Sequence, residues 1–363
     1  MKLTDREWKA FRIGTLFEVN GTVTTKPGAL IAGGNTPRIT CSATNNGLDG
    51  FYYNSPTERG NVMTVESAAI GFVTYQENAF IATDHVEKLV LKERILTPGL
   101  GLFMKSAIDK AISGKYNYGY KFSQDRIKRQ MIMLPITDAG EPDYDFMEQY
   151  VREILLKNKD KYLSFAKKRI AEIGEWKGAG SLTDREWKAF TVEELFSRIV
   201  ATRGKTTGQL VPGDDVPYIA AAKNNNGCAG VYSSKDHPEW VSEGNCVVFV
   251  QLGDGAAGIA HYVPMDFIGM SGKTSCGYID GVLNCYNGIF IAKALSINKE
   301  LFSHGHSWTG RRLLNSKCML PVTNDGKPDY EFMEQYIKDL MLQKYFQYMD
   351  FLTERNGVYD DKC

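Results

Sequence analysis

The chain has few of the features from which a function is most often inferred. Its 363 residues include seven cysteines, none of which forms a C-x-x-C pair; they are Cys41, Cys228, Cys246, Cys276, Cys285, Cys318 and Cys363. An odd, scattered set does not suggest a disulfide framework and is typical of reduced thiols in the cytosol. No apolar run approaches the ~20 residues of a membrane span, and the polar N-terminus is not a signal peptide. We therefore expect a cytoplasmic protein with no membrane partner.

The chain also lacks an excess of charge of either sign. It has 43 Lys and Arg residues against 43 Asp and Glu residues, although residues 1–181 carry +4 and residues 182–363 carry −4. This balance does not by itself indicate a nucleic-acid-binding protein. It does not exclude one, because a local basic face can lie on a neutral protein.

Catalytic and metal motifs are scarce. There is no G-x-S-x-G, no P-loop and no repeated Ser/His/Asp order. His304 and His306 form a pair, but no carboxylate or cysteine lies at ligand spacing, so we expect no metal. Gly253–Gly258 matches G-x-G-x-x-G, yet the strand-like segment 259–264 follows where a dinucleotide site needs a helix. A tight hairpin is favoured, and an enzyme that binds a nucleotide or small ligand there is the alternative.

What the chain does have is a long internal repeat. Leu3–Phe11 returns identically at Leu182–Phe190, and Pro142–Tyr150 returns at Pro328–Tyr336 with one Asp→Glu change. Nine identical residues are strong evidence of duplication, and the length allows two domains with separate cores. A duplicated enzyme should keep its chemical residues in both copies. Because the repeated residues are of structural types, the repeat favours binding over catalysis.

Each copy begins with a block of mixed character. Thr4 and Glu7 have the spacing of a capping box, which predicts a helical turn. Asn-Asn-Gly at 45–47 and 225–227 predicts hairpins. Segment 99–112 has a helical apolar pattern, whereas segments 70–75, 79–82, 89–91 and, in the second copy, 288–292 have strand-like patterns. The predicted fold class is therefore α+β, with two similar domains of mixed β-sheet and short helices.

A long helix follows each block. Apolar residues recur three or four apart after Asp143 and again after Asp329, over up to ~30 residues. Such stripes predict an antiparallel, coiled-coil-like pair with pseudo-twofold symmetry; the alternative is that each helix caps its own block. The predicted organisation is a first domain at 1–140, a helix at 141–176, a linker at 177–181, a second domain at 182–325 and a helix at 326–357.

Basic, aromatic and amide side chains in the variable stretches are candidates for DNA contacts. Lys and Arg neutralise phosphates, and Arg, Asn, Gln and Lys can recognise base edges. An ordinary solvated basic surface is the alternative. The candidates are Lys26, Arg38, Asn45, Lys115, Tyr116, Tyr118, Tyr120, Lys121 and Arg126 in the first copy and Arg203, Lys205, Thr206, Lys223, Asn225, Trp308, Arg311 and Arg312 in the second.

The order of these motifs resembles the specificity (S) subunits of type I restriction–modification systems and of the related type IIB systems. The resemblance is carried by the duplicated block–helix plan, by Met-Leu-Pro at 133–135 and 319–321, by Glu-Gln at 148–149 and 334–335, and by the run from Pro217 to Tyr232. It extends from about residue 3 to about residue 355. The Pro-Asp-Tyr-x-Phe-Met-Glu-Gln-Tyr helix start looks more like the type IIB branch.

The resemblance implies a non-catalytic subunit with two target recognition domains. Each would recognise one half of a bipartite site on double-stranded DNA, and the helices would fix the spacer and dock modification subunits, of which two copies would fit. Those partners would carry S-adenosylmethionine and methylate adenine N6 by base flipping, with a restriction subunit or fused nuclease as a further partner. This chain has no S-adenosylmethionine motif, so no cofactor is expected on it. The candidate docking residues are Phe146, Gln149, Tyr150, Phe332, Gln335 and Tyr336. A structural adaptor without DNA specificity is a further alternative.

Overall fold

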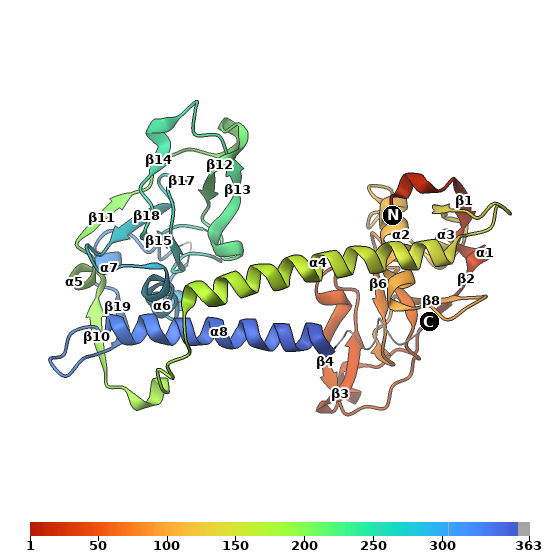
Figure 1. Cartoon of the computed structure of the whole chain (residues 1–363), viewed down its shortest axis with the longest axis horizontal. Coiled ribbons are helices and arrows are strands. Elements are labelled where there is room, and N and C mark those ends of the chain that lie inside the picture. Colours follow the sequence, from red (N-terminus) through yellow and green to blue (C-terminus); the bar gives the residue numbers. More distant parts are fainter. Residues whose placement is uncertain (254, 304, 355–363) are drawn as a thin grey trace. The chain divides into compact units, whose positions relative to one another are not determined.

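The computed structural model describes residues 1–253, 255–303 and 305–354, and these form two compact units. The first unit contains residues 1–164, and the second begins at Phe165 and includes the last helix (Figure 1). The two units are described separately below. None of the helices in the described part of the chain is long and apolar enough to cross a membrane.

The first unit is built from two sheets, a two-stranded ribbon and helices. Sheet β2-β8-β5-β6 is antiparallel, sheet β4-β3-β7 contains one parallel pair (β3 with β7), and β1 pairs with β9. Helix α2 packs on this framework. Its elements are η1 (Leu3–Asp5), β1 (Trp8–Arg12), α1 (Ile13–Leu16), β2 (Phe17–Gly21), η2 (Pro27–Ala29), β3 (Ala32–Ile39), η3 (Asn45–Gly47), β4 (Leu48–Tyr52), β5 (Val62–Glu66), β6 (Val73–Gln76), β7 (Ile81–Ala82), β8 (Val86–Leu91), α2 (Pro98–Ile112), α3 (Gln124–Arg129), β9 (Met131–Pro135) and the first part of α4 (Tyr144–Ile173).

The second unit repeats this plan. Sheet β11-β18-β15-β16 corresponds to β2-β8-β5-β6, ribbon β10-β19 to β1-β9, and β13-β12-β17 to β4-β3-β7, with β14 added. Its elements are η4 (Leu182–Asp184), β10 (Trp187–Thr191), α5 (Val192–Leu195), β11 (Arg198–Ala201), η5 (Thr207–Gln209), β12 (Pro212–Ile219), η6 (Asn225–Gly227), β13 (Cys228–Tyr232), η7 (Pro238–Trp240), β14 (Val241–Ser242), β15 (Cys246–Val250), β16 (Ala260–Val263), β17 (Phe267–Gly269), β18 (Thr274–Tyr278), α6 (Cys285–Ser296), η8 (Lys299–Leu301), α7 (Gly310–Leu314), β19 (Lys317–Pro321) and α8 (Tyr330–Glu354). The predicted α+β class with two similar domains is confirmed.

The Asn-Asn-Gly turns form the predicted hairpins. They join β3 to β4 and β12 to β13, and all three residues of each turn have positive φ. Asn and Gly tolerate this left-handed region best. The Asn46 and Asn226 amides also donate to the carbonyl oxygens of Tyr75 and Tyr262, at 2.9 Å in both units.

Two local predictions are wrong. Segment 288–292 lies inside α6, not in a strand, because the Asn284 side chain caps a helix that starts at Cys285. Gly288 lets this helix approach Tyr262, as Gly101 lets α2 approach Tyr75. Thr4 and Glu7 do not form the helical cap either: the first turn is η1, and the Asp5 carboxylate accepts from the Lys2 N–H at 2.8 Å.

The long helices begin at the repeated stretch, and aspartates cap them. Asp143 accepts from the Phe146 N–H at 3.0 Å, and Asp329 from the Phe332 N–H at 2.9 Å. The chain leaves the helical conformation after Ile173, and the structure describes α8 to Glu354. Residues 355–357 of the second predicted helix lie outside the described residues.

Within the second unit the end of α4 packs antiparallel to α8. Phe165 meets Tyr345 with ring centroids 6.3 Å apart, and Ala166 is fully buried. Further along, the backbone N–H groups of Lys177 and Ala179 donate to Asp339 at 3.2 and 2.7 Å. As the residue number rises from 165 to 179 in the first segment, the residue number of its contact on α8 falls from 345 to 339. The two segments therefore run antiparallel. The first turns of α8 also enter the core of their own block through Met333 and Ile337. The end of α4 therefore packs on α8, and the start of α8 packs on its own block, so features of both predicted arrangements occur. The pseudo-twofold symmetry stays a prediction.

Candidate nucleic-acid interface

The best-defined group of candidates is a small hairpin at 115–122, here called the tyrosine hairpin. Asn117 and Tyr120 pair in both directions at 3.2 and 3.0 Å, and the Asn117 side chain accepts a further bond from the Tyr120 N–H at 2.9 Å. Tyr118 and Gly119 form the tip. Because Phe122 is fully buried in the core, the hairpin is anchored at its base.

Aromatic rings and cations are stacked along this hairpin. Tyr116 lies parallel to Tyr120, with centroids 5.6 Å apart, and 4.4 Å from Phe122. The Arg126 guanidinium is 3.8 Å from the centroid of Tyr120, and the Lys121 ammonium is 5.1 Å from that of Tyr118. Burial raises the pKa of the Tyr116 hydroxyl, which donates to Gln130 at 2.9 Å. The structure thus brings five predicted residues together in one cluster: Tyr116, Tyr118, Tyr120, Lys121 and Arg126.

The equivalent segment of the second unit has a different surface. Ser303 and His306 form the matching bridge, and Phe302 stacks on Trp308 at 5.3 Å. Trp308 is only 1% exposed and its indole N–H donates to Ser316 at 2.7 Å. The prediction that Trp308 contacts DNA is therefore wrong, because this side chain belongs to the core. Position 304 of the candidate histidine pair lies outside the described residues.

Arg311 and Arg312 are exposed near the start of α7. Arg311 lies 4.0 Å from Glu193, with both side chains mostly exposed, so the ion pair is weak. Both arginines are accessible to an anionic ligand, and their contact with DNA stays a prediction.

The early loops divide into exposed and buried candidates. Arg38 on β3 is 8% exposed and pairs with Asp49 at 2.7 Å. The Arg38 hydrogen bond holds the pKa of the Asp49 carboxyl below its usual value. Arg38 therefore has a structural role, which corrects the prediction of a free base-contacting arginine. By contrast, Lys26 and Asn45 are exposed.

In the second unit the predicted loop residues are all exposed: Arg203, Lys205, Thr206, Lys223 and Asn225. Lys205 lies 5.5 Å from the ring centroid of Trp240. Arg203 lines a shallow cavity of about 350 Å³ with Arg198 and Ser242. Asn225 donates to the Cys228 carbonyl at 2.9 Å, as Asn45 does to Leu48 at 3.2 Å. The two asparagines therefore also maintain their turns.

The repeated helix start contacts the repeated N-terminal stretch. Arg6 donates to Asp143 at 2.8 Å and lies 4.9 Å from the Phe146 ring; in the second unit Arg185 lies 3.7 Å from Asp329 and 4.2 Å from the Phe332 ring. Phe146 and Phe332 are only 3% and 4% exposed. The prediction that these two phenylalanines dock a partner is wrong, because each is covered within its own unit.

The other candidates for partner docking are more accessible. Gln149 is exposed, whereas Gln335, Tyr150 and Tyr336 are half-buried. Both tyrosines pack edge-on against a phenylalanine of a neighbouring helix: Tyr150 against Phe103 of α2, and Tyr336 against Phe290 of α6. At the start of α4 a partner would therefore meet Gln149 more readily than the aromatic side. At the start of α8, Gln335 is no more accessible than Tyr336 and donates to Asp339 at 2.9 Å.

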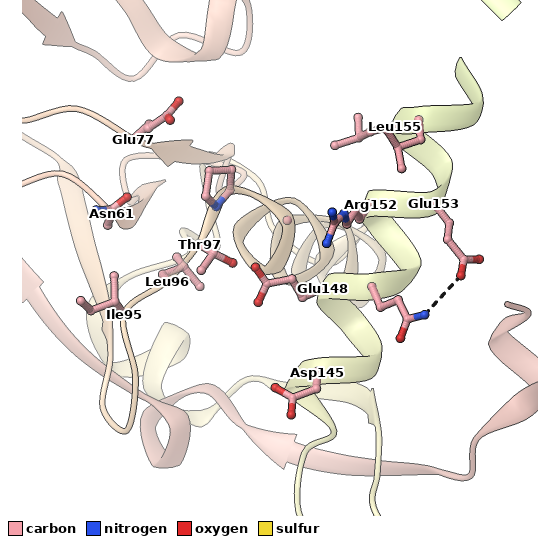
Figure 2. A pocket seen from close by; sticks show the side chains of 14 residues that line it. Asn61, Glu77, Ile95, Leu96, Thr97, Asp145, Glu148, Arg152, Glu153 and Leu155 are labelled. Carbon is pink, nitrogen blue, oxygen red and sulfur yellow. Dashed lines mark hydrogen bonds between the residues drawn. The ribbon is translucent and has the colours of Figure 1, made fainter. Parts of the chain in front are cut away.

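A cavity of about 920 Å³ beside α4 was not predicted from the sequence. Glu148 and Arg152 of α4 and Thr97 before α2 line it (Figure 2). Gln149 and Gly99 belong to the same lining. The sequence held one indication of this place, since Glu148 is repeated as Glu334. The residue that faces it, Gly99, lies in a segment too divergent to align without the structure.

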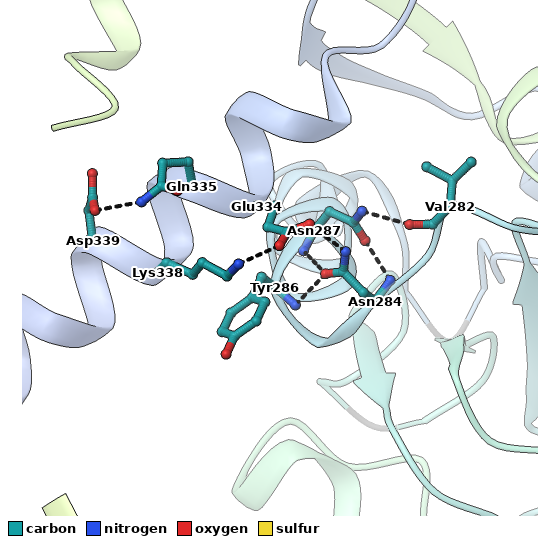
Figure 3. A network of polar contacts seen from close by, with 8 residues as sticks. All are labelled: Val282, Asn284, Tyr286, Asn287, Glu334, Gln335, Lys338 and Asp339. Atoms are coloured by element: carbon teal, nitrogen blue, oxygen red, sulfur yellow. Dashed lines mark hydrogen bonds and ion pairs between the residues drawn. The ribbon is translucent and has the colours of Figure 1, made fainter. Parts of the chain in front are cut away.

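The corresponding place in the second unit is filled by a polar network. Glu334 accepts from Asn284 at 2.7 Å and from Lys338 at 2.5 Å (Figure 3). Lys338 also lies 4.8 Å from the ring centroid of Tyr286, a residue that replaces Gly99. The two units thus share a fold but differ in the surface beside their long helices.

The glycine-rich segment lies between two antiparallel strands. Val250 and Ile259 pair across it at 2.8 Å, and β15 and β16 continue the ladder. No helix begins at these glycines in the described residues, so the context required for a dinucleotide site is missing. Asp254 itself lies outside the described residues. No group of three or more His, Cys, Asp or Glu side chains suited to a metal occurs in the parts of the chain that the structure covers.

Comparisons with known proteins agree on the class. Residues 5–162 match the family described as the type I restriction modification DNA specificity domain. The chain is 28% identical over 306 residues to the "Type II restriction enzyme BgcI specificity subunit S.BcgI" of Heyndrickxia coagulans, covering 83% of this chain and 85% of that protein. A crystal structure of a type I restriction–modification system S subunit from M. genitalium shares the fold, with a TM-score of 0.56, 13% identity, and coverage of 99% and 96% of the two chains.

The resemblance expected from the sequence is confirmed: residues 5–162 match the type I DNA specificity domain, and most of the chain is similar to a restriction enzyme specificity subunit. The type I S subunit structure shares the fold.

Proposed function

We propose that each unit recognises one half of a bipartite DNA site and that α4 and α8 fix the unread spacer between the halves. The observation that carries this proposal is a contrast inside the repeat. The order of the shared strands, the Asn-Asn-Gly turns and the aspartate caps of α4 and α8 are the same in both units, whereas exposed side chains at equivalent positions differ. In the tyrosine hairpin, Tyr120 and Lys121 of the first unit correspond to His306 and Ser307 of the second. One scaffold with two different surfaces suits two different half-sites.

The partners follow from this proposal. The chain would act as the non-catalytic subunit of a cytoplasmic DNA adenine methyltransferase complex, with modification subunits that bring S-adenosylmethionine and with or without a nuclease. The repeated helix starts, at the exposed Gln149 and the half-buried Gln335, would be the docking surface for two identical partners. The relative of the type II class supports the type IIB branch over the common type I form.

The competing proposal is an adaptor without DNA specificity. It explains the repeated helices but not the exposed aromatic and basic side chains of the tyrosine hairpin, which contribute little to the core. The two proposals differ in one measurable property, which is sequence-dependent binding by the assembled complex.

Binding of the assembled complex to DNA tests the proposal. The motif is first found by methylome sequencing of cells that express the chain with its modification partners. Fluorescence anisotropy then compares a duplex that carries this motif with duplexes in which the first half, the second half or the spacer is scrambled. We expect each half-site change to weaken binding and the spacer change to have no effect. Equal affinity for all four duplexes would favour the adaptor.

A further inference from the structure

The tip of the tyrosine hairpin presents an aromatic ring that the first unit does not cover. Tyr118 is 80% exposed, more than the neighbouring Tyr120 at 51%. Large exposed aromatic side chains are uncommon without a binding role when they lie in a cluster of their own kind. The Tyr118 ring lies 5.1 Å from the Lys121 ammonium.

Hydrogen bonds hold the hairpin that carries this ring. Three hydrogen bonds between Asn117 and Tyr120 close the turn. The Tyr116 hydroxyl is tied to Gln130, and an Arg126 guanidinium N–H donates to the Lys121 carbonyl at 2.7 Å. A backbone that is already ordered loses little conformational entropy on binding. The tyrosine hairpin therefore presents Tyr118 to a flat partner from an ordered turn.

The charge around the ring indicates an anionic partner. Residues 115–129 include five basic side chains and one acidic side chain; the basic ones are Lys115, Lys121, Arg126, Lys128 and Arg129. Nucleic acid combines flat apolar bases with a dense row of phosphates. Aromatic side chains stack on bases of any identity, and neighbouring cations bind the backbone.

We propose that Tyr118 stacks on an unstacked or kinked base step in the half-site that the first unit recognises, while Lys121 and the basic side chains of α3 (Arg126, Lys128 and Arg129) hold the adjacent phosphates. This inference rests on the proposed function. It adds that the two half-sites are bound by different chemistry. In the corresponding hairpin of the second unit, His306 and Ser307 stand where Tyr120 and Lys121 stand in the first. Buried Trp308 corresponds to buried Phe122, so the difference lies in the exposed residues.

Three variants of one side chain separate stacking from other roles. Tyr118→Phe keeps the ring, Tyr118→Leu keeps only apolar bulk, and Tyr118→Ala removes both. In the assembled complex on the methylome-derived duplex, we expect Phe to bind within about twofold of the parent and Ala to bind about 10- to 100-fold more weakly. Leu should lie between them. Tyr53→Ala, at another tyrosine that is 70% exposed in the same unit, is the matched control and should change affinity less than about threefold.

A spectroscopic measurement locates the stacked base. 2-Aminopurine is placed at successive positions of each half-site, because its fluorescence reports loss or gain of stacking. The parent complex and Tyr118→Phe should change the emission at one step of the first half-site, Tyr118→Ala should not, and the second half-site should be unaffected by either substitution.

The outcomes separate this inference from the function on which it rests. If Tyr118→Ala binds as the parent does, or if the emission change survives in it, Tyr118 does not stack on a base, and the recognition role stands. If the parent complex shows no sequence-dependent binding at all, the proposed function itself fails. Thermal unfolding of Tyr118→Ala should match the parent, because the side chain is exposed; a large loss of stability would also overturn the inference.

Discussion

At the scale of single residues, the two best-repeated stretches are kept because they contact each other. Arg6 joins the N-terminal stretch to the cap of α4 through Asp143 and to the face of Phe146. Arg185 repeats the arrangement with Asp329 and Phe332. The repeated motif therefore sets the start and direction of each long helix, and its aromatic residue is not a surface group.

Asp143 provides a test of this residue-level role. Asp143→Ala removes both the helix cap and the ion pair with Arg6, and should lower the free energy of unfolding of the first unit by about 1–2 kcal/mol. Asp143→Asn keeps the cap and should cost less. Urea denaturation followed by circular dichroism measures both. Equal losses for Ala and Asn would show that the cap contributes nothing.

The same pair has a predicted pH dependence. Burial alone would raise the pKa of the Asp143 carboxyl, but the hydrogen bonds from Arg6 and from the Phe146 N–H outweigh burial and lower it. A carboxyl with a lowered folded pKa stabilises the fold above its unfolded pKa of about 3.9 and loses this contribution as the pH falls through the folded value. Asp143→Asn should therefore differ most from the parent at neutral pH and converge with it in strong acid.

At the scale of elements, the sequence predicted what is periodic or locally encoded. The Asn-Asn-Gly turns, segment 99–112 and the two long helices were predicted because positive φ and three-to-four spacing leave direct marks on the sequence. Segment 288–292 was misassigned because five apolar residues have no distinctive period. The Asn284 cap and the contact of Gly288 with Tyr262 decide in favour of a helix, and the second of these is visible only in three dimensions.

Several site predictions failed because the burial of a side chain is likewise visible only in three dimensions. Four of the candidates have side chains of kinds that often bind ligands: Arg38, Trp308, Phe146 and Phe332. Only the structure shows that Asp49 pairs with Arg38 and that the other three side chains lie in the core. The aromatic and basic residues at 115–121 were candidates together because they are adjacent in the sequence, and the structure folds them into one hairpin. The cavity beside Glu148 was missed because its lining comes from segments that are far apart in the sequence, from Asn61 to Leu156.

The contact between α4 and α8 can be tested at one small residue. Ala166 is fully buried where the end of α4 meets α8. Ala166→Leu inserts a larger side chain into a packed site and should destabilise the second unit by about 1–3 kcal/mol. Ala171→Leu, at an exposed position of the same helix, should change stability by less than about 0.5 kcal/mol. If thermal unfolding shifts equally in both variants, Ala166 does not pack tightly there.

At the scale of the whole molecule, duplication gives one architecture two recognition surfaces. The order of the shared strands, the Asn-Asn-Gly turns and the aspartate caps of the long helices repeat between the units. On the proposed function, such a chain can change one half-site without disturbing the other, since each unit has its own core.

Exchange of one unit tests this central claim most directly. Residues 182–322 are replaced by the corresponding block of another specificity subunit, the hybrid is expressed with the modification partners, and the methylome is sequenced. The account predicts that one half of the methylated motif changes while the other half and the spacer length stay as they were. A change in both halves, or in neither, would contradict it.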